Sequence, residues 1–150
     1  MTLIITIVIT AVLMEGVAWW MHKYIMHGIF WNLHEDHHVR ENHDSFFERN
    51  DFFFVFFSVL AITAFALWSI YGWVICLGIG IGISIYGAVY FFVHDLFIHQ
   101  RVKVLRNTNN RYLKALRRGH KMHHKHLGKH DGECFGMLWV PLKYFRKEFK

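Results

Sequence analysis

The sequence predicts an all-α integral membrane protein with three transmembrane helices and a cytoplasmic, histidine-rich helical cap. The first observation is composition: the 150 residues are 54% hydrophobic and 18% aromatic, which is rich for a soluble domain. The second is that three apolar runs are long enough to cross a bilayer. The third is that ten of the thirteen histidines fall into four short motifs, at or beyond the ends of these runs. The length suits one domain covering residues 1–150.

The first apolar run covers Leu3 to Met21 and contains one charged residue, Glu15. At about 1.5 Å per residue, a helix of this length crosses the roughly 30 Å hydrocarbon core. The run has no basic start and no small-residue cleavage site, so we expect a retained span rather than a signal peptide. An ionisable group at this depth needs a partner within the bundle. Glu15 therefore either supports the floor of a functional site or makes a structural hydrogen bond between helices.

The next two apolar runs, Phe52 to Tyr71 and Trp73 to Val93, are joined at Gly72 and predict a transmembrane hairpin. Asn50 or Asp51 is expected to cap the first of these helices, because both side chains accept hydrogen bonds from first-turn amides.

Glycines in the third run predict close helix packing. Gly78 and Gly82 have the small-xxx-small spacing, whereas Ile83 breaks the dinucleotide-binding fingerprint. Beyond this run we expect a helix over Tyr112 to His124. The apolar patch from Phe135 to Leu142 is too short to span and is expected to lie against the membrane surface or the site.

The distribution of charge predicts the orientation. All seventeen lysines and arginines follow either the first or the third apolar run. The positive-inside rule then places residues 22–51 and 94–150 in the cytoplasm and the N-terminus outside. All four histidine motifs come out on the same side of the membrane. The formal charge of +6 lies beside apolar spans, which fits anionic lipid head groups and argues against nucleic acid.

The histidine motifs form two matching sets, each a His-x4-His pair followed by a His-x2-His-His triple. The first set is His22, His27, His34, His37 and His38, and the second is His94, His99, His120, His123 and His124. On an α-helix, positions i, i+3 and i+4 share one face, so each triple is expected to converge on one small volume. Five residues turn a helix through about 500°, which leaves the members of each pair about 140° apart. Either the helix distorts, or the two histidines of a pair bind different metals.

Ten histidines are too many for a single catalytic zinc, which normally has three protein ligands and a water. Two metals that share about five imidazoles each fit the pattern, and redox metals on neutral nitrogen ligands suit oxygen activation. Asp95, Asp51 and Glu15 are candidates for residues that support the site without binding metal, and Glu35 and Asp36 are also near in sequence. The histidines outside the motifs are expected to have no role in the site: His43, His126 and His130.

The motifs HKYIMH, HEDHH, HDLFIH and HKMHH resemble those of bacterial β-carotene hydroxylases, within the fatty acid hydroxylase/sterol desaturase superfamily. The blocks GVAWWMHKYIMHG, FERND, YFFVHDLFIHQR, YLKALRRGHKMHH and CFGMLWVP resemble the carotenoid 3-hydroxylases as well, and together they cover nearly the whole chain. The resemblance implies a di-iron, non-haem mono-oxygenase of the bacterial inner membrane that uses O2 and a ferredoxin-type electron donor. It implies hydroxylation of β-carotene at ring carbon 3, through β-cryptoxanthin to zeaxanthin, with ring-ketolated carotenoids as alternative substrates. Some superfamily members have four spans, so the tail leaves room for a fourth membrane-embedded element.

Two features of the chain bear on electron transfer. The chain has no flavin, haem or dinucleotide motif, so electrons are expected from a separate protein. A basic face is expected to steer an acidic donor or to anchor lipid head groups, and its arginines are Arg101, Arg106, Arg111, Arg117 and Arg118.

The motifs are also compatible with other functions. Within the superfamily they are carotenoid ketolation and fatty-acyl or sterol oxidation. A metal transporter or store is a different class, but a transporter needs ligands near mid-membrane, where only Glu15 is ionisable. A bis-histidine haem protein would leave most of the motifs unexplained.

Overall fold

The computed structural model is all-helical over the residues it describes, which are 1–39, 46–103, 105–128, 130 and 132–146. Helix α1 (Thr2–Trp20) runs without a break into a π-helical segment, η1 (Met21–Ile29), and a kink at Gly28 separates this from α2 (Trp31–His38). Helix α3 (Asp51–Tyr71) and helix α4 (Val74–Tyr90) follow, and α4 continues into a second π-helical segment, η2 (Phe91–Ile98). Helix α5 (Arg111–His123) and a short 3₁₀ turn, η3 (Leu142–Phe145), complete the described part.

Within the described residues, three helical stretches are long and apolar enough to cross a membrane, as predicted: Thr2–Ile29, Asp51–Tyr71 and Val74–Ile98. Many large apolar side chains on them are exposed, which is expected where lipid is the solvent. The sequence placed the ends of the first and third runs too early, because both helices continue through the histidine pairs as π-helix.

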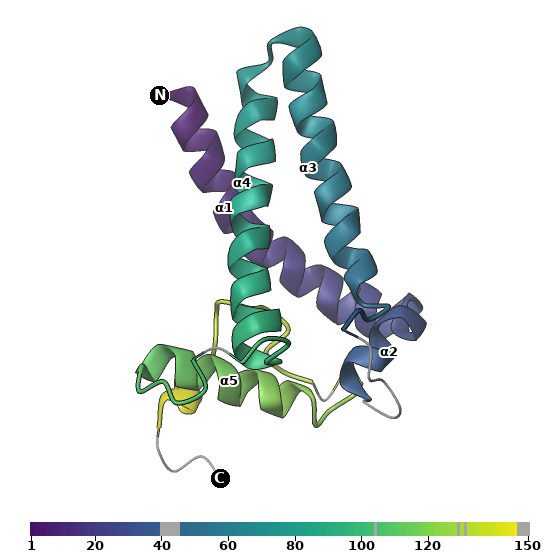
Figure 1. Ribbon diagram of the computed structural model, residues 1–150, viewed down its shortest axis with the longest axis vertical. Helices are drawn as coiled ribbons and strands as arrows, with labels where there is room; N and C mark the ends of the chain where they lie inside the picture. The colour runs from purple at the N-terminus through teal and green to yellow at the C-terminus, as the bar shows by residue number, and fades with distance from the viewer. Residues whose placement is uncertain (40–45, 104, 129, 131, 147–150) are drawn as a thin grey trace.

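The three long helices pack through α4, which contacts both α1 and α3. Figure 1 shows the upright α3–α4 hairpin, with α1 running diagonally across it. The predicted role of the glycines in close packing is confirmed. A Cβ atom on Gly78 would lie 2.7 Å from Thr6 Cβ, and one on Gly82 would lie 2.6 Å from Thr10 Cβ. Gly72 ends α3 in the left-handed conformation (φ 70°), which explains the turn there.

The cap lies at one end of the bundle, where α2, α5 and the C-terminal segment meet the ends of α1 and α4 (Figure 1). Its hydrophobic core joins η2 to α5 and to the segment after it. The core consists of Val93, Ala115, Leu116, Met137, Val140 and Tyr144. This packing fixes α5 beneath the spans and thereby brings the last histidine motif to the first.

Candidate metal centre

All four histidine motifs meet in the cap. Nine of the ten predicted histidines form two groups, in each of which the ring nitrogens lie within 4.8 Å of one another. The first group is His22, His27, His34, His38 and His123, and the second group is His37, His94, His99 and His120. The tenth, His124, adjoins the second group, because its Nε2 lies 2.8 Å from His120 Nε2. His126 and His130 are exposed, and His43 lies outside the described residues.

The π-helical segments explain how each His-x4-His pair serves one group. A π-helix bonds residue i to residue i+5, so residues five apart lie on the same side. The amide of His99 donates to the carbonyl of His94 at 2.9 Å, and the amide of Phe30 donates to Ile25 at 2.9 Å. His22 and His27 accordingly share the first group, and His94 and His99 the second. Of the two alternatives left by helix arithmetic, local distortion is the one observed.

The triples do not converge as predicted. His34 and His38 belong to the first group, whereas His37 between them belongs to the second. In the last motif His123 joins the first group and His120 the second. Adjacent residues on an α-helix point about 100° apart, so a triple spreads widely enough to face two centres. Each triple therefore contributes its middle histidine to the other group, and neither group is built from one half of the sequence.

In two pairs of rings of the first group, Nε2 atoms face each other at a distance that a bound cation would stabilise. His22 and His34 face each other with their Nε2 atoms 3.0 Å apart. His22 Nδ1 donates to the carbonyl oxygen of Phe135 at 2.8 Å, and His34 Nδ1 donates to Asn50 Oδ1 at 2.7 Å. With the protons on Nδ1, both neutral rings present a lone pair on Nε2. Lone pairs this close repel unless a positive charge lies between them.

The same opposition recurs between His27 and His123, whose Nε2 atoms are 3.1 Å apart. His27 Nδ1 donates to the carbonyl of Leu127 at 2.8 Å, and His123 Nδ1 donates to the carbonyl of Glu133 at 3.1 Å. Because a carbonyl only accepts hydrogen bonds, the tautomer of both rings is fixed with Nε2 free for a metal.

Protonation of the rings does not supply this positive charge. Burial, with the neighbouring imidazoles adding to it, lowers the pKa of His123 to about 2 and that of His124 to about 4. Burial also lowers the pKa of His34 to about 3, despite its bond to Asn50. The pKa values of His37 and His120 are likewise well below the ordinary value, chiefly because both rings are buried. These rings are neutral at physiological pH, which is the form that binds metal.

The second group also has buried ring nitrogens that are placed to bind a cation. His37 Nε2 and His94 Nε2 are buried and have no hydrogen-bond partner among the described residues. His99 Nε2 and His120 Nε2 are 2.7 Å apart. Buried polar atoms without partners are costly, and metal ions bound to these nitrogens would satisfy them. The donor set of both groups thus fits metal ions held by neutral imidazoles.

Carboxylates support the second group. His37 Nδ1 lies 2.9 Å from Glu48 Oε2, and His94 Nδ1 lies 3.3 Å from Asp95 Oδ2. Asp95 thus lies where the sequence suggested. Asp51 makes no hydrogen bond with a histidine among the described residues, and its carboxylate accepts from Arg101 at 2.7 Å. Sequence reasoning missed Glu48, whose only signal was its place in the FERND block.

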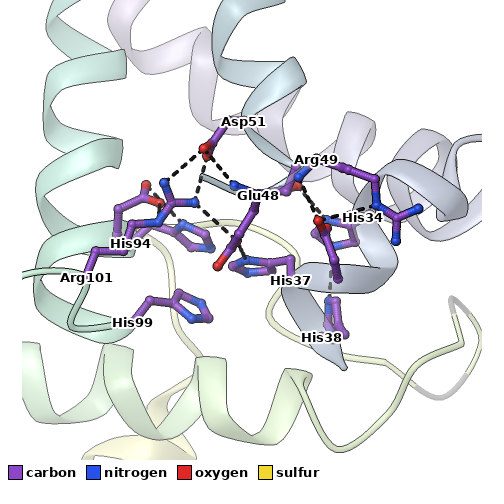
Figure 2. Close-up of polar contacts among 12 residues, drawn as sticks. His34, His37, His38, Glu48, Arg49, Asp51, His94, His99 and Arg101 are labelled. Carbon is purple, nitrogen blue, oxygen red and sulfur yellow. Dashed lines mark hydrogen bonds and ion pairs between the residues drawn. The ribbon is translucent and has the colours of Figure 1, made fainter. Parts of the chain in front are cut away.

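Arg101 joins these carboxylates (Figure 2). Its guanidinium contacts Glu48 at 3.1 Å, Asp95 at 3.0 Å and Asp51 at 2.7 Å. Burial alone would lower the pKa of Arg101, but the three acidic partners raise it. Burial raises the pKa of Glu48, and Arg101 opposes that shift. With its side chain only 5% exposed, Arg101 is unsuited to the predicted steering of an electron donor.

Two further expectations about side chains have different outcomes: Asn50 does not cap α3 as predicted, whereas Glu15 of α1 makes the structural hydrogen bond between helices that the sequence left open, to Tyr86 of α4. Asn50 occupies the N-cap position of α3 but makes no capping bond, because its amide oxygen is used by His34. Glu15 contacts no histidine in the described hydrogen bonds. It accepts from the backbone amides of Leu138 and Trp139 at 2.8 and 2.9 Å, and from the Tyr86 hydroxyl at 2.8 Å.

The C-terminal segment is therefore part of the centre. It supplies the carbonyls of Leu127, Glu133 and Phe135 to the first group, and Glu15 holds the stretch just after Phe135 against α1. The apolar patch predicted over Phe135 to Leu142 does lie against the site, while Trp139 and Leu142 remain 79% and 84% exposed.

The sequence matches those of known proteins over most of its length. The sequence profile of the fatty acid hydroxylase family matches residues 7–143. A beta-carotene hydroxylase of Paracoccus sp. (strain PC1) is 35% identical over 142 residues, covering 94% of this chain and 86% of the relative. A beta-carotene hydroxylase of Pantoea ananas is 41% identical over 133 residues, covering 89% of this chain and 74% of the relative. Beta-carotene 3-hydroxylase 2, chloroplastic, of Arabidopsis thaliana is 35% identical over 138 residues, covering 87% of this chain and 43% of the relative. No solved structure matches the chain.

Proposed function

The chain belongs to the fatty acid hydroxylase family, and from this premise we propose that it is a membrane-bound β-carotene 3-hydroxylase. It is a non-haem di-iron mono-oxygenase that converts β-carotene to zeaxanthin through β-cryptoxanthin. Residues 1–150 act as one domain. The bacterial relatives are named beta-carotene hydroxylases and a plant relative is named a 3-hydroxylase, which supports both the substrate and the position of reaction.

The observation that carries this proposal is the pair of adjacent histidine groups. The first would hold one iron ion through His22, His27, His34, His38 and His123. The second would hold the other through His37, His94, His99 and His120, with His124 beside them. Bound iron would supply the activation of O2 and the oxidation of a C–H bond, with two electrons and two protons reducing the second oxygen atom to water.

The protein's own contribution is to orient the histidine rings and to hold the substrate in place. The Nδ1 partners fix the ring tautomers and point Nε2 inward. Burial of the groups excludes bulk water from the reacting centre. The site lies at the ends of the spans, so one ring of a long apolar substrate can reach it from the bilayer while the rest stays in lipid. Holding that ring in place decides which carbon reacts.

The membrane context follows from the same spans. We place the protein in the bacterial inner membrane with its N-terminus outside and the cap in the cytoplasm, because the lysines and arginines lie on the cap side. A ferredoxin-type donor supplies the electrons. Arg106 and Arg111 are exposed and are better placed than Arg101 to meet an acidic donor or lipid head groups.

Expression in cells that accumulate β-carotene tests the proposal directly. With a working electron donor, the pigments should shift to β-cryptoxanthin and zeaxanthin, and His37→Ala should leave β-carotene unchanged. Ketolated pigments would instead indicate a ketolase. An unchanged pigment pool with the donor present would contradict the carotenoid substrate, and metal uptake into vesicles without any oxidised product would indicate a transporter.

A further inference from the structure

The two histidine groups differ in the charge of the partners that hold their Nδ1 atoms. In the first group every described partner is neutral. Three are backbone carbonyls, those of Phe135, Leu127 and Glu133, and the fourth is the amide oxygen of Asn50. None of these partners adds a formal charge next to an imidazole.

In the second group the described Nδ1 partners are carboxylates. Glu48 accepts from His37 at 2.9 Å and Asp95 from His94 at 3.3 Å. Both side chains are only 9% exposed, so water screens them poorly. Arg101 bridges the two and also Asp51. Three carboxylates against one guanidinium leave two negative charges beside this group.

This difference in charge alters how strongly each set of rings donates to a metal. A hydrogen bond from imidazole N–H to a carboxylate is stronger than one to a neutral carbonyl. It moves electron density toward Nε2 and raises the basicity of the ligand. A more basic ligand with negative charge behind it favours the higher charge on the ion that it binds.

We propose that the two iron positions are unequal in redox potential, that the iron of the second group is oxidised first, and that Glu48 is the positioning residue that sets the difference. The inference rests on the proposed di-iron function. When a one-electron oxidant of the ferricyanide class is added, one Fe(II) becomes Fe(III) and the oxidant is reduced by that electron. No bond within the protein forms or breaks.

Two nearly isosteric substitutions, one beside each histidine group, test whether these partners set the difference in redox potential. Glu48→Gln removes the charge behind His37, and Asn50→Asp adds one behind His34. The purified protein, loaded with ⁵⁷Fe, is titrated potentiometrically and followed by Mössbauer spectroscopy, which distinguishes Fe(II) from Fe(III) at each position. Wild-type protein should pass through a state with one localised Fe(III).

Glu48→Gln should raise the lower of the two potentials and change the spectrum of the iron oxidised first. Asn50→Asp should lower the higher potential and change only the other iron. Both variants therefore reduce the difference between the two redox potentials, each by shifting a different iron. A tenfold change in the preference for Fe(III) over Fe(II), at the lower end of effects of residues behind metal ligands, corresponds to about 59 mV.

Asp51→Asn is the matched control, since it removes a charge from the same Arg101 network and Asp51 is hydrogen-bonded to no histidine in the described part of the chain. Its effect on the lower potential should be smaller than that of Glu48→Gln. If Glu48→Gln does not fold, Asp95→Asn should raise the same potential through His94. Equal potentials in wild-type protein, or a shift of the same iron by Glu48→Gln and Asn50→Asp, would overturn the inference alone. Fewer than two irons per wild-type chain would overturn the di-iron function as well.

Discussion

The two histidine groups present the same kind of metal-binding atom, the imidazole nitrogen, but different kinds of partner hold their rings in place. The first group is oriented mainly by the backbone carbonyls of Leu127, Glu133 and Phe135. Leu127 and Phe135 lie about one hundred positions away from His27 and His22 in sequence. The second group is oriented by side chains, Glu48 and Asp95, joined through Arg101. The first group thus depends on the C-terminal segment closing over it, whereas the second depends on a balance of buried charges. One centre is built by two different physical means.

Substitution of a histidine in either group is expected to have the largest effect on metal binding, and it also tests which histidine belongs to which group. His123 comes from the last motif but belongs to the first group, so His123→Ala should weaken the metal position formed by His22 and His27. His37→Ala should weaken the other position. Loss of a direct ligand should lower metal affinity by more than about 100-fold, since substitutions behind ligands already cost 10- to 100-fold, and hydroxylation should be abolished. Metal content and pigment analysis measure both effects.

The exposed His130 provides the control, because His130→Ala should retain both metals and full activity. If His123→Ala perturbed the iron that Glu48→Gln also perturbs, the crossed arrangement would be wrong.

The division of each histidine triple between the two groups separates what the sequence predicts from what it does not. The spans, the hairpin and the histidines that gather in the cap were predictable, because hydropathy and motif spacing are local properties. Asp95 was predictable since it adjoins a histidine. The division of each triple was not, because it depends on where α2 and α5 lie relative to each other. The carbonyls behind the first group carried no signal at all, since any residue type supplies one.

The dependence of stability on pH tests a feature that the two groups share, the burial of neutral imidazole rings. His34, His123 and His124 have folded-state pKa values of about 3, 2 and 4, below the unfolded value of about 6.5. Between those limits the unfolded chain binds more protons than the folded chain, so stability is lost as pH falls. Each ring should cost up to about 1.4 kcal/mol per pH unit below pH 6.5.

Unfolding of the metal-free protein in detergent, followed by tryptophan fluorescence at pH 7, 6 and 5, measures this loss. Replacing His124 by Asn removes one titrating ring and should make the dependence shallower. A midpoint that stays constant from pH 7 to pH 5 would show that these rings are not buried in the neutral form.

The smallest expected effect concerns Glu15, which links the lipid-facing helix α1 to the C-terminal segment. Its carboxylate accepts from the amides of Leu138 and Trp139, and a backbone segment beside a membrane span needs such partners because lipid offers none. Glu15→Ala would leave these amides unpaired and should cost about 1–3 kcal/mol of stability. Glu15→Gln keeps an accepting oxygen and should cost less. Because Phe135 precedes this stretch, Glu15→Ala should also loosen the orientation of His22 while sparing the second group. The Mössbauer signals of the two irons distinguish the cases: a change in the first-group iron alone supports the link, whereas equal changes in both would show that Glu15 acts only on global stability.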